Sequence, residues 1–221
     1  MYPLCLNISG RLCVVIGGGL VAERKVRGLL HAGGLVRVVS PVVTSGLAEL
    51  AEQHAIDWRP KTYSRADLDG ALLVFAATDN TGVQQTVWHD ARADGLLINV
   101  ADAPQACDFQ VPAVVRRGDL ILSVATNGTS PAVAAMVRRR VEREFGDEYG
   151  LLTAIAGLIR EQLLAEGRGS EEIKFLFDKI LCDDIVVWLR HRRWDKVQQH
   201  VKGVLGWPAD FVREILNKVT P

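Results

Sequence analysis

The sequence of 221 residues has no long hydrophobic run and no excess of charge of either sign. Its longest apolar stretch, residues 71–77, is far shorter than the roughly 20 residues that a membrane-spanning helix needs. Twenty-six lysines and arginines balance 26 aspartates and glutamates, so no overall field attracts nucleic acid or an anionic membrane. We therefore expect neither a nucleic acid nor a membrane as partner, and an anionic substrate must be bound by local charge.

Disulfide and metal-binding patterns are also missing. The four cysteines are scattered without a C-x-x-C pair, and the five histidines form no metal-ligand motif. The N-terminus has neither a basic stretch nor a long apolar core, so it is not typical of a signal peptide. These features favour a cytoplasmic location and predict no protein-bound metal.

The strongest positive signal lies in residues 12–40, which read as strand, tight turn, helix and strand in the length of one βαβ unit. In the turn, Gly17, Gly19 and Ala22 fit the pattern G-x-G-x-x-A. The two glycines allow a sharp turn and the approach of a pyrophosphate, and the small Ala22 allows helix and strand to pack closely. The pattern predicts a dinucleotide site; the alternative is a glycine turn that only joins a strand to a helix.

The position after the second predicted strand leaves the choice between NAD and NADP open. An acidic residue often stands there and binds the ribose hydroxyls of NAD. Here the position is Ser40, which is able to bind a ribose hydroxyl or to tolerate a 2′-phosphate.

Polar residues follow two further predicted strands. Thr78 and Asp79 come after the longest apolar run, and Asn99 and Asp102 lie at the end of the run 96–100. Because open parallel sheets bind ligands at the carboxyl ends of their strands, these residues are candidates for cofactor or substrate contact. The alternative is that they serve only as turn and helix-capping residues.

The pattern changes after residue 112. Two strand-like stretches, residues 109–115 and 120–125, flank a turn at residues 116–119, and Ser130 then caps a helix. A short edge strand is also expected at residues 2–8. The predicted fold class is α/β, in three parts: a Rossmann-like parallel sheet over 1–112, a small domain of strands and a helix over 113–147, and a helical domain over 148–221.

Five segments occur in the order typical of a known family: IGGGLVAERK, VVSP, AATDN, NVADAP and TNGTSP. Over residues 2–144 the chain resembles the precorrin-2 dehydrogenase/sirohydrochlorin ferrochelatase family, which includes the N-terminal part of sirohaem synthase. The resemblance implies NAD-dependent oxidation of precorrin-2, a tetrapyrrole, to sirohydrochlorin. It also implies a homodimer whose middle domain mediates dimerisation and, in some members, insertion of Fe²⁺ as a second substrate.

The resemblance further implies site residues. Asp102 matches the catalytic aspartate of the family, which accepts a proton or orients the macrocycle. Positions that contact NAD in the family correspond here to Leu20, Val21, Pro41 and Val42. A loop at the N-terminus of a helix suits a substrate carboxylate, and here it comprises Asn127, Gly128, Thr129 and Ser130.

An alternative of another class is an NAD(H)-sensing regulatory module. Such a module needs the glycine turn but does not need Asp102. Substituting Asp102 therefore separates the enzyme from the sensor.

Overall fold

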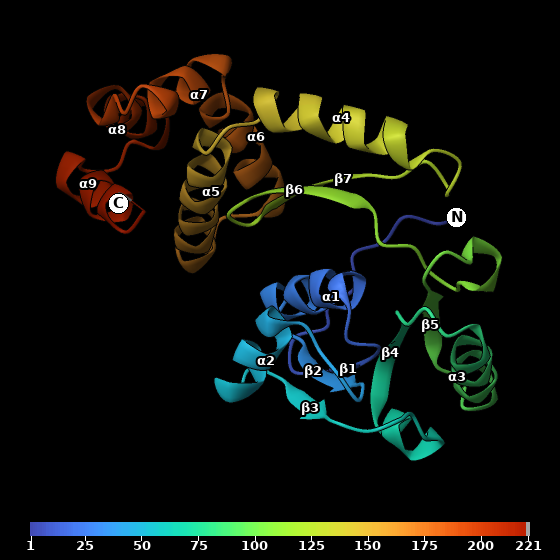
Figure 1. Cartoon of the computed structure of the whole chain (residues 1–221). Coiled ribbons are helices and arrows are strands. Elements are labelled where there is room, and N and C mark those ends of the chain that lie inside the picture. Colours follow the sequence, from blue (N-terminus) through green and yellow to red (C-terminus); the bar gives the residue numbers. More distant parts are fainter. Residues whose placement is uncertain (220–221) are drawn as a thin grey trace. The chain divides into compact units, whose positions relative to one another are not determined.

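The computed structural model describes residues 1–219 (Figure 1). The chain separates into two compact units, of which the first is Met1–Val111 and the second begins at Pro112. Residues 220 and 221, the end of the predicted domain 148–221, lie outside the described range. Each unit has its own hydrophobic core and is described by itself.

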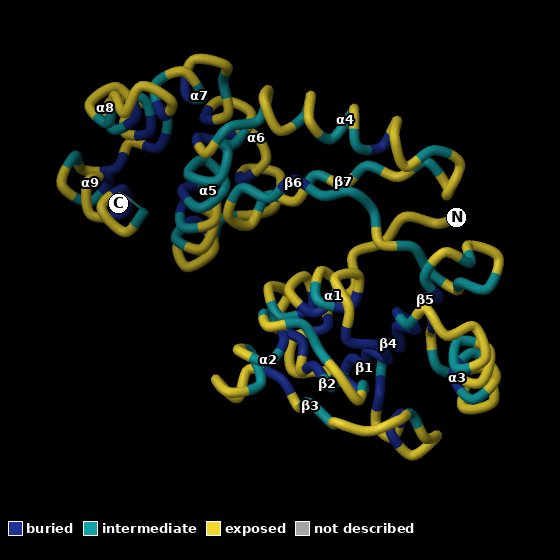
Figure 2. Tube along the Cα trace, in the orientation of Figure 1, coloured by how far each residue is buried: buried dark blue, intermediate teal, exposed yellow. Residues whose placement is uncertain are grey.

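A five-stranded parallel sheet in the order β3-β2-β1-β4-β5 forms the centre of the first unit. Nearly all residues of β1 and β4 are buried (dark blue in Figure 2). Burial on both faces explains why these two strands read as continuous apolar runs instead of alternating ones. The strands are β1 (Leu12–Ile16), β2 (Leu35–Val39), β3 (Asp57–Arg59), β4 (Ala71–Ala76) and β5 (Leu97–Val100).

Helices cover both faces of this sheet. Val26 of α1 and Leu47 of α2 pack on one face with Val15, while Val87 of α3 packs on the other face with Val14. Val14 and Val15, which are neighbours in β1, thus belong to hydrophobic cores on opposite faces of the sheet, as the two-residue period of a strand requires. The predicted Rossmann-like α/β fold is confirmed. The helices are α1 (Leu20–His31), α2 (Ser45–Glu52), α3 (Thr81–Ala93) and the 3₁₀ helices η1 (Arg65–Leu68) and η2 (Pro104–Ala106).

The second unit combines an antiparallel hairpin with helices. Strands β6 (Ala113–Arg117) and β7 (Leu120–Val124) precede α4 (Pro131–Glu144). The following helices bury a shared apolar core, so the predicted helical C-terminal part is present. The boundary at residue 147 and a dimerising role for residues 113–147 stay predictions. The core helices are α5 (Glu148–Ala165), α6 (Ser170–Ile180), α7 (Asp183–Arg190), α8 (Trp194–Leu205) and α9 (Ala209–Asn217).

Two local expectations are wrong, and one helix was not singled out. Residues 2–8 form no strand, because β1 lies inside the sheet with β2 and β4 as its neighbours and leaves no free edge beside it. The hairpin turn is shorter than expected, since Arg116 and Arg117 pair with β7 and leave Gly118 and Asp119 to turn. The sequence patterns also miss α7, whose eight residues offer only about two turns of helical periodicity.

Within residues 1–219, no helix combines the length and the apolar character that crossing a membrane requires.

A buried carboxylate stabilises the connection between β3 and β4. Asp67 of η1 is fully buried, and its oxygens lie 2.9 Å from Arg59 Nη1, 2.8 Å from Lys61 Nζ and 2.9 Å from the backbone nitrogen of Ser64. Burial by itself would raise the pKa of Asp67, but the hydrogen bonds from Lys61, Ser64 and Arg59 outweigh burial and lower that pKa to about 2. The ionised form of Asp67 therefore stabilises this part of the fold at neutral pH.

Replacing Asp67 by Asn is expected to reduce the free energy of unfolding at pH 7 by about 2 kcal/mol, because the amide loses charged hydrogen bonds. The folded-state pKa is depressed below the unfolded value of about 3.9. The contribution of Asp67 is therefore complete above about pH 4 and is lost as the pH falls toward about 2. Urea unfolding of both proteins across this range should show their difference shrinking with falling pH.

The matched control is Asp69→Asn, which removes an exposed carboxylate two residues away. Its free energy of unfolding should stay within about 0.5 kcal/mol of wild type. Equal losses in the two variants would contradict a specific role for Asp67.

Candidate functional site

The tight turn between β1 and α1 lies at the carboxyl edge of the sheet. Gly17 has a φ of +124°, and a Cβ there would lie 2.2 Å from the carbonyl oxygen of Ala77, which follows β4. Both the conformation and the available space therefore exclude a side chain. Since β1 and β4 are neighbours across the point where the strand order reverses, the turn stands where open α/β sheets bind ligands.

Gly19 has different surroundings. A Cβ at Gly19 would meet nothing within 4 Å, so the space beside its backbone is open. Gly19 begins α1 without a side-chain cap, whereas Thr44 and Asn80 cap α2 and α3. The first N–H groups of α1 and the positive end of its dipole are therefore available to an anion. The open space and the uncapped helix together fit a pyrophosphate group.

The apolar residues predicted to contact NAD differ in exposure. Leu20 and Val42 are 79% and 76% exposed, which is high for large apolar side chains and leaves both available as walls for a ligand. Val21 and Pro41 are also exposed. Ala22 is fully buried in the core beneath α1, so its small size serves packing.

The G-x-G-x-x-A pattern misses the middle glycine. A Cβ at Gly18 would lie 2.0 Å from the carbonyl oxygen of Val42. The carbonyl oxygen of Gly18 accepts a hydrogen bond from the backbone nitrogen of Thr44 at 2.9 Å. Gly18 thus lets the segment after β2 pack against the turn. The available signal was the run of three glycines, of which the pattern uses only two.

Ser40 directly follows β2 and forms hydrogen bonds with Val42 and Trp58. Its Oγ donates to the carbonyl oxygen of Val42 at 2.7 Å, and its carbonyl oxygen accepts from Trp58 Nε1 at 3.0 Å. The Oγ atom keeps acceptor capacity for a ribose hydroxyl.

Thr78 and Asp79 follow β4 beside the glycine turn. The side chain of Gln84 donates to the carbonyl oxygen of Thr78 at 2.6 Å, which orients the start of α3. Asn80, not Asp79, caps α3 by accepting from the backbone nitrogen of Val83 at 3.0 Å. Asp79 is exposed, and contact of Thr78 and Asp79 with a nucleotide stays a prediction.

Asn99 lies within β5 and is only 8% exposed. Its flanking residues, Ile98 and Val100, face α3, so Asn99 faces α1 on the other side of the sheet. There its Oδ1 accepts a hydrogen bond from Lys25 Nζ at 2.8 Å, and its Nδ2 donates to the carbonyl oxygen of Phe109 at 3.0 Å. These contacts occupy the amide, and a nucleotide contact of Asn99 stays a prediction.

The sequence analysis did not single out Lys25 and missed this contact. Burial is the main cause that lowers the pKa of Lys25, and the positive charge of Arg24 adds to it. The available signal was the strand period: Asn99 lies between two apolar residues and needs a polar partner on the opposite face.

Asp102 lies in the loop after β5 and is exposed. Its φ of +60° is uncommon for a residue with a side chain, although Asp tolerates this left-handed region better than most. Cys107 closes the loop: its Sγ lies 3.2 Å from the backbone nitrogen of Val100 and 3.4 Å from the carbonyl oxygen of Ala103. The Asp102 carboxylate is therefore presented from a closed loop at the carboxyl edge of the sheet, the edge that also bears the glycine turn.

The predicted substrate loop belongs to the second unit. Asn127 and Gly128 have φ values of +50° and +79°, and Thr129 completes a turn by donating its backbone N–H to the carbonyl oxygen of Thr126. Ser130 Oγ accepts from the backbone nitrogen of Val133 at 3.3 Å and so caps α4. Binding of a substrate carboxylate by residues 127–130 stays a prediction.

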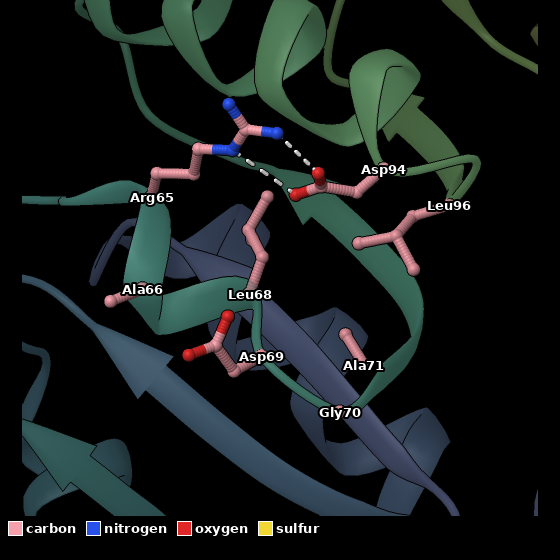
Figure 3. A pocket seen from close by; sticks show the side chains of 8 residues that line it. All are labelled: Arg65, Ala66, Leu68, Asp69, Gly70, Ala71, Asp94 and Leu96. Carbon is pink, nitrogen blue, oxygen red and sulfur yellow. Dashed lines mark hydrogen bonds and ion pairs between the residues drawn. The ribbon is translucent and has the colours of Figure 1, made fainter.

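A hollow at the opposite, amino edge of the sheet is lined by residues of η1, by residues 69–71 at the start of β4, and by Asp94 and Leu96 in the turn between α3 and β5 (Figure 3). Arg65 and Asp94 form an ion pair across it. Because ligands of open parallel sheets bind at the carboxyl edge, this hollow is not the candidate site. Among residues 1–219, no group of three or more His, Cys, Asp or Glu side chains is placed to hold a metal ion.

Comparison with protein families gives two matches. Residues 4–113 match the family titled "Putative NAD(P)-binding", and residues 117–144 match "Sirohaem biosynthesis protein central". The first match covers the parallel sheet with the glycine turn and Asp102, and the second covers the last residue of β6 and all of β7 and α4.

Curated relatives include sirohaem synthases of several bacteria. The chain is 37% identical to that of Nitrosococcus oceani over 183 residues, which are 83% of this chain and 39% of the relative. It is 41% identical to that of Methylobacillus flagellatus over 159 residues, which are 72% of this chain and 34% of the relative. The chain therefore spans less than half the length of these relatives.

A solved structure titled SirC, precorrin-2 dehydrogenase, has a TM-score of 0.76 and covers 94% of this chain and 100% of its own. At 23% sequence identity this likeness concerns the fold. The two family matches and the sirohaem synthase relatives show that the chain belongs to the family that its motifs indicate, that of the precorrin-2 dehydrogenases and of the N-terminal part of sirohaem synthase.

Proposed function

We propose that this chain binds NAD⁺ at the β1–α1 turn and oxidises precorrin-2 to sirohydrochlorin. The observation that carries the proposal is the position of Asp102. The loop after β5 presents this carboxylate at the same edge of the sheet as the uncapped start of α1. The family match and the name of the relatives support the choice of cofactor and pathway.

The residues at the turn fit the cofactor. The open space at Gly19 and the first N–H groups of α1 would receive the pyrophosphate. Leu20 and Val42 would line the nucleotide, and Ser40 would accept a hydrogen bond from a ribose hydroxyl. When bound, NAD⁺ supplies the hydride acceptor.

The oxidation removes two hydrogens from precorrin-2, one as a hydride and one as a proton. The Asp102 carboxylate would accept the proton from the macrocycle as the hydride leaves. Its exposure allows the proton to pass on to water. The turn of residues 127–130 would hold a substrate carboxylate. The cytoplasm is the proposed location, in keeping with the four free cysteines.

One assay tests both the oxidation of precorrin-2 and the insertion of Fe²⁺. The visible spectrum of protein given precorrin-2 and NAD⁺ without oxygen should change to that of sirohydrochlorin. Adding Fe²⁺ as a second substrate tests iron insertion, which requires a further change to the sirohaem spectrum faster than the spontaneous rate.

A homodimer is also proposed, through residues 113–147. This segment buries little of its own apolar surface: Val115 and Ala134 are buried, whereas Ile121, Val133 and Met136 are 48%, 46% and 57% exposed. A two-stranded hairpin is marginally stable by itself and needs further elements packed against it. A second copy of the segment would cover these side chains.

Gly19→Ala is expected to fold like wild type, because the added Cβ meets no atom and the φ of −84° suits alanine. Its affinity for NAD⁺ should fall about tenfold or more, since the methyl group occupies the space of the pyrophosphate. Calorimetric titration with NAD⁺ and thermal unfolding measure the two effects. Gly28→Ala is the control: it adds a methyl group to α1 in open space and should leave NAD⁺ affinity unchanged. Similar NAD⁺ affinities in both variants would count against this site.

Asp102→Asn should keep the affinity for NAD⁺ but lower kcat for precorrin-2 oxidation about 100-fold or more. Asparagine tolerates the φ of +60° as well as aspartate does, so the loop should keep its shape. Asp69→Asn serves as control and should keep wild-type kcat. The NAD(H)-sensing module would be favoured if the wild type binds NAD⁺ without oxidising precorrin-2 and the Asp102→Asn variant behaves like the wild type.

Met136→Lys should convert a dimer to a monomer in light-scattering chromatography, because a charge would be buried at the interface. Phe175→Lys is the control, since Phe175 is 58% exposed on α6, outside residues 113–147. A monomeric wild type, or equal dissociation in both variants, would refute the proposed interface.

A further inference from the structure

Lys25 of α1 is partly buried in the first unit. Its Nζ donates to Asn99 Oδ1 at 2.8 Å and lies 5.0 Å from the centre of the Phe75 ring. Among the described residues Lys25 forms no ion pair. Burial is the largest influence on the pKa of Lys25 and lowers it, whereas the negative charge of Asp102 acts in the opposite direction. No direct ion pair therefore accounts for the position of Lys25.

The contact to Asn99 has a defined direction. A lysine ammonium group only donates hydrogen bonds, so the atom that faces Lys25 is the amide oxygen of Asn99. The carbonyl oxygen of Phe109 only accepts, so the atom that faces it, at 3.0 Å, is the amide nitrogen. Lys25 thus orients the Asn99 amide, and the amide in turn holds the chain that returns from the Asp102 loop.

The same amide reaches the closure of that loop. Asn99 Nδ2 lies 3.5 Å from Cys107 Sγ, and this sulfur accepts from the backbone nitrogen of Val100 at 3.2 Å. Asp102 lies between Val100 and Cys107 in the left-handed conformation, which needs support from its surroundings. A continuous series of contacts, from Lys25 to Asn99 and from Asn99 to Cys107, therefore connects α1 with the segment that contains Asp102.

We infer that Lys25 is a positioning residue for Asp102. Through Asn99 it holds residues 100–109 in the closed conformation that presents the Asp102 carboxylate at the carboxyl edge of the sheet. It also connects the helix that would bind NAD⁺ to the loop that would accept the proton. The effect on turnover rests on the proposed function, whereas the effect on loop closure does not.

Kinetics test the effect on turnover. Lys25→Met keeps the length of the side chain and removes its charge and donors. Its kcat for precorrin-2 oxidation should fall about tenfold or more, because a displaced catalytic group reacts slowly, while KM for NAD⁺ should change less than about twofold. Arg65→Met removes one positive charge at the amino edge of the sheet and should keep wild-type kcat.

A double variant separates positioning from a general loss of structure. If Lys25 acts through Asp102, Lys25→Met should not lower kcat further once Asp102 is replaced by Asn. Losses that multiply in the double variant would show that Lys25 acts independently of Asp102 and would overturn the inference.

Loop closure has its own measurement. Alkylation by iodoacetamide, followed at each cysteine by peptide mass spectrometry, should modify Cys107 about threefold faster or more in Lys25→Met, because the loop opens more often. Cys5 is exposed and outside the loop, so its rate is the internal control in the same sample. Where Lys25→Met does not fold, Lys25→Gln, which also removes the charge, takes its place with the same expected directions.

The outcomes distinguish the two proposals. If the wild type fails to oxidise precorrin-2, the proposed function is refuted. Faster Cys107 alkylation in Lys25→Met would still support the role of Lys25 in keeping the loop closed. An active wild type with unchanged kcat or unchanged Cys107 alkylation in Lys25→Met refutes the inference.

Discussion

The close approach of β1 and β4 at their carboxyl ends is the constraint on which the candidate site depends. Only a residue without a Cβ can occupy position 17, because the carbonyl oxygen of Ala77 takes that space. The turn forced there directs α1 back along the sheet, with its N-terminus left uncapped. Because β5 pairs with β4, the same edge also bears the Asp102 loop. One steric condition thus brings the phosphate-binding turn and the carboxylate to a common edge.

The fold was largely predictable because its signals are local. Buried parallel strands read as apolar runs, and residues 12–40 contain a complete βαβ unit within one window of the sequence. The glycine pattern likewise places the start of α1 correctly. Residues 2–8 could not be assigned locally, since whether they pair depends on the position of β1 inside the sheet.

The contacts within the site were less predictable. Lys25 and Asn99 are 74 residues apart, and no periodicity relates them. The strand period places the side chain of Asn99 on the sheet face opposite to Ile98 and Val100. Which helix covers each face is known only from the structure. The two buried or partly buried charges also have different neighbours. Asp67 is surrounded by cations and hydrogen-bond donors, whereas Lys25 lies beside an amide oxygen and an aromatic ring. Composition alone does not distinguish these situations.

The separate cores of the two units have an evolutionary consequence. Apolar side chains of α5 to α9 pack among themselves, and those of the parallel sheet pack with α1, α2 and α3. Selection on the helical core demands only an apolar pattern of suitable volume, while selection on the sheet must preserve specific glycines and loop residues. The sheet and the five-helix core are therefore free to diverge at different rates.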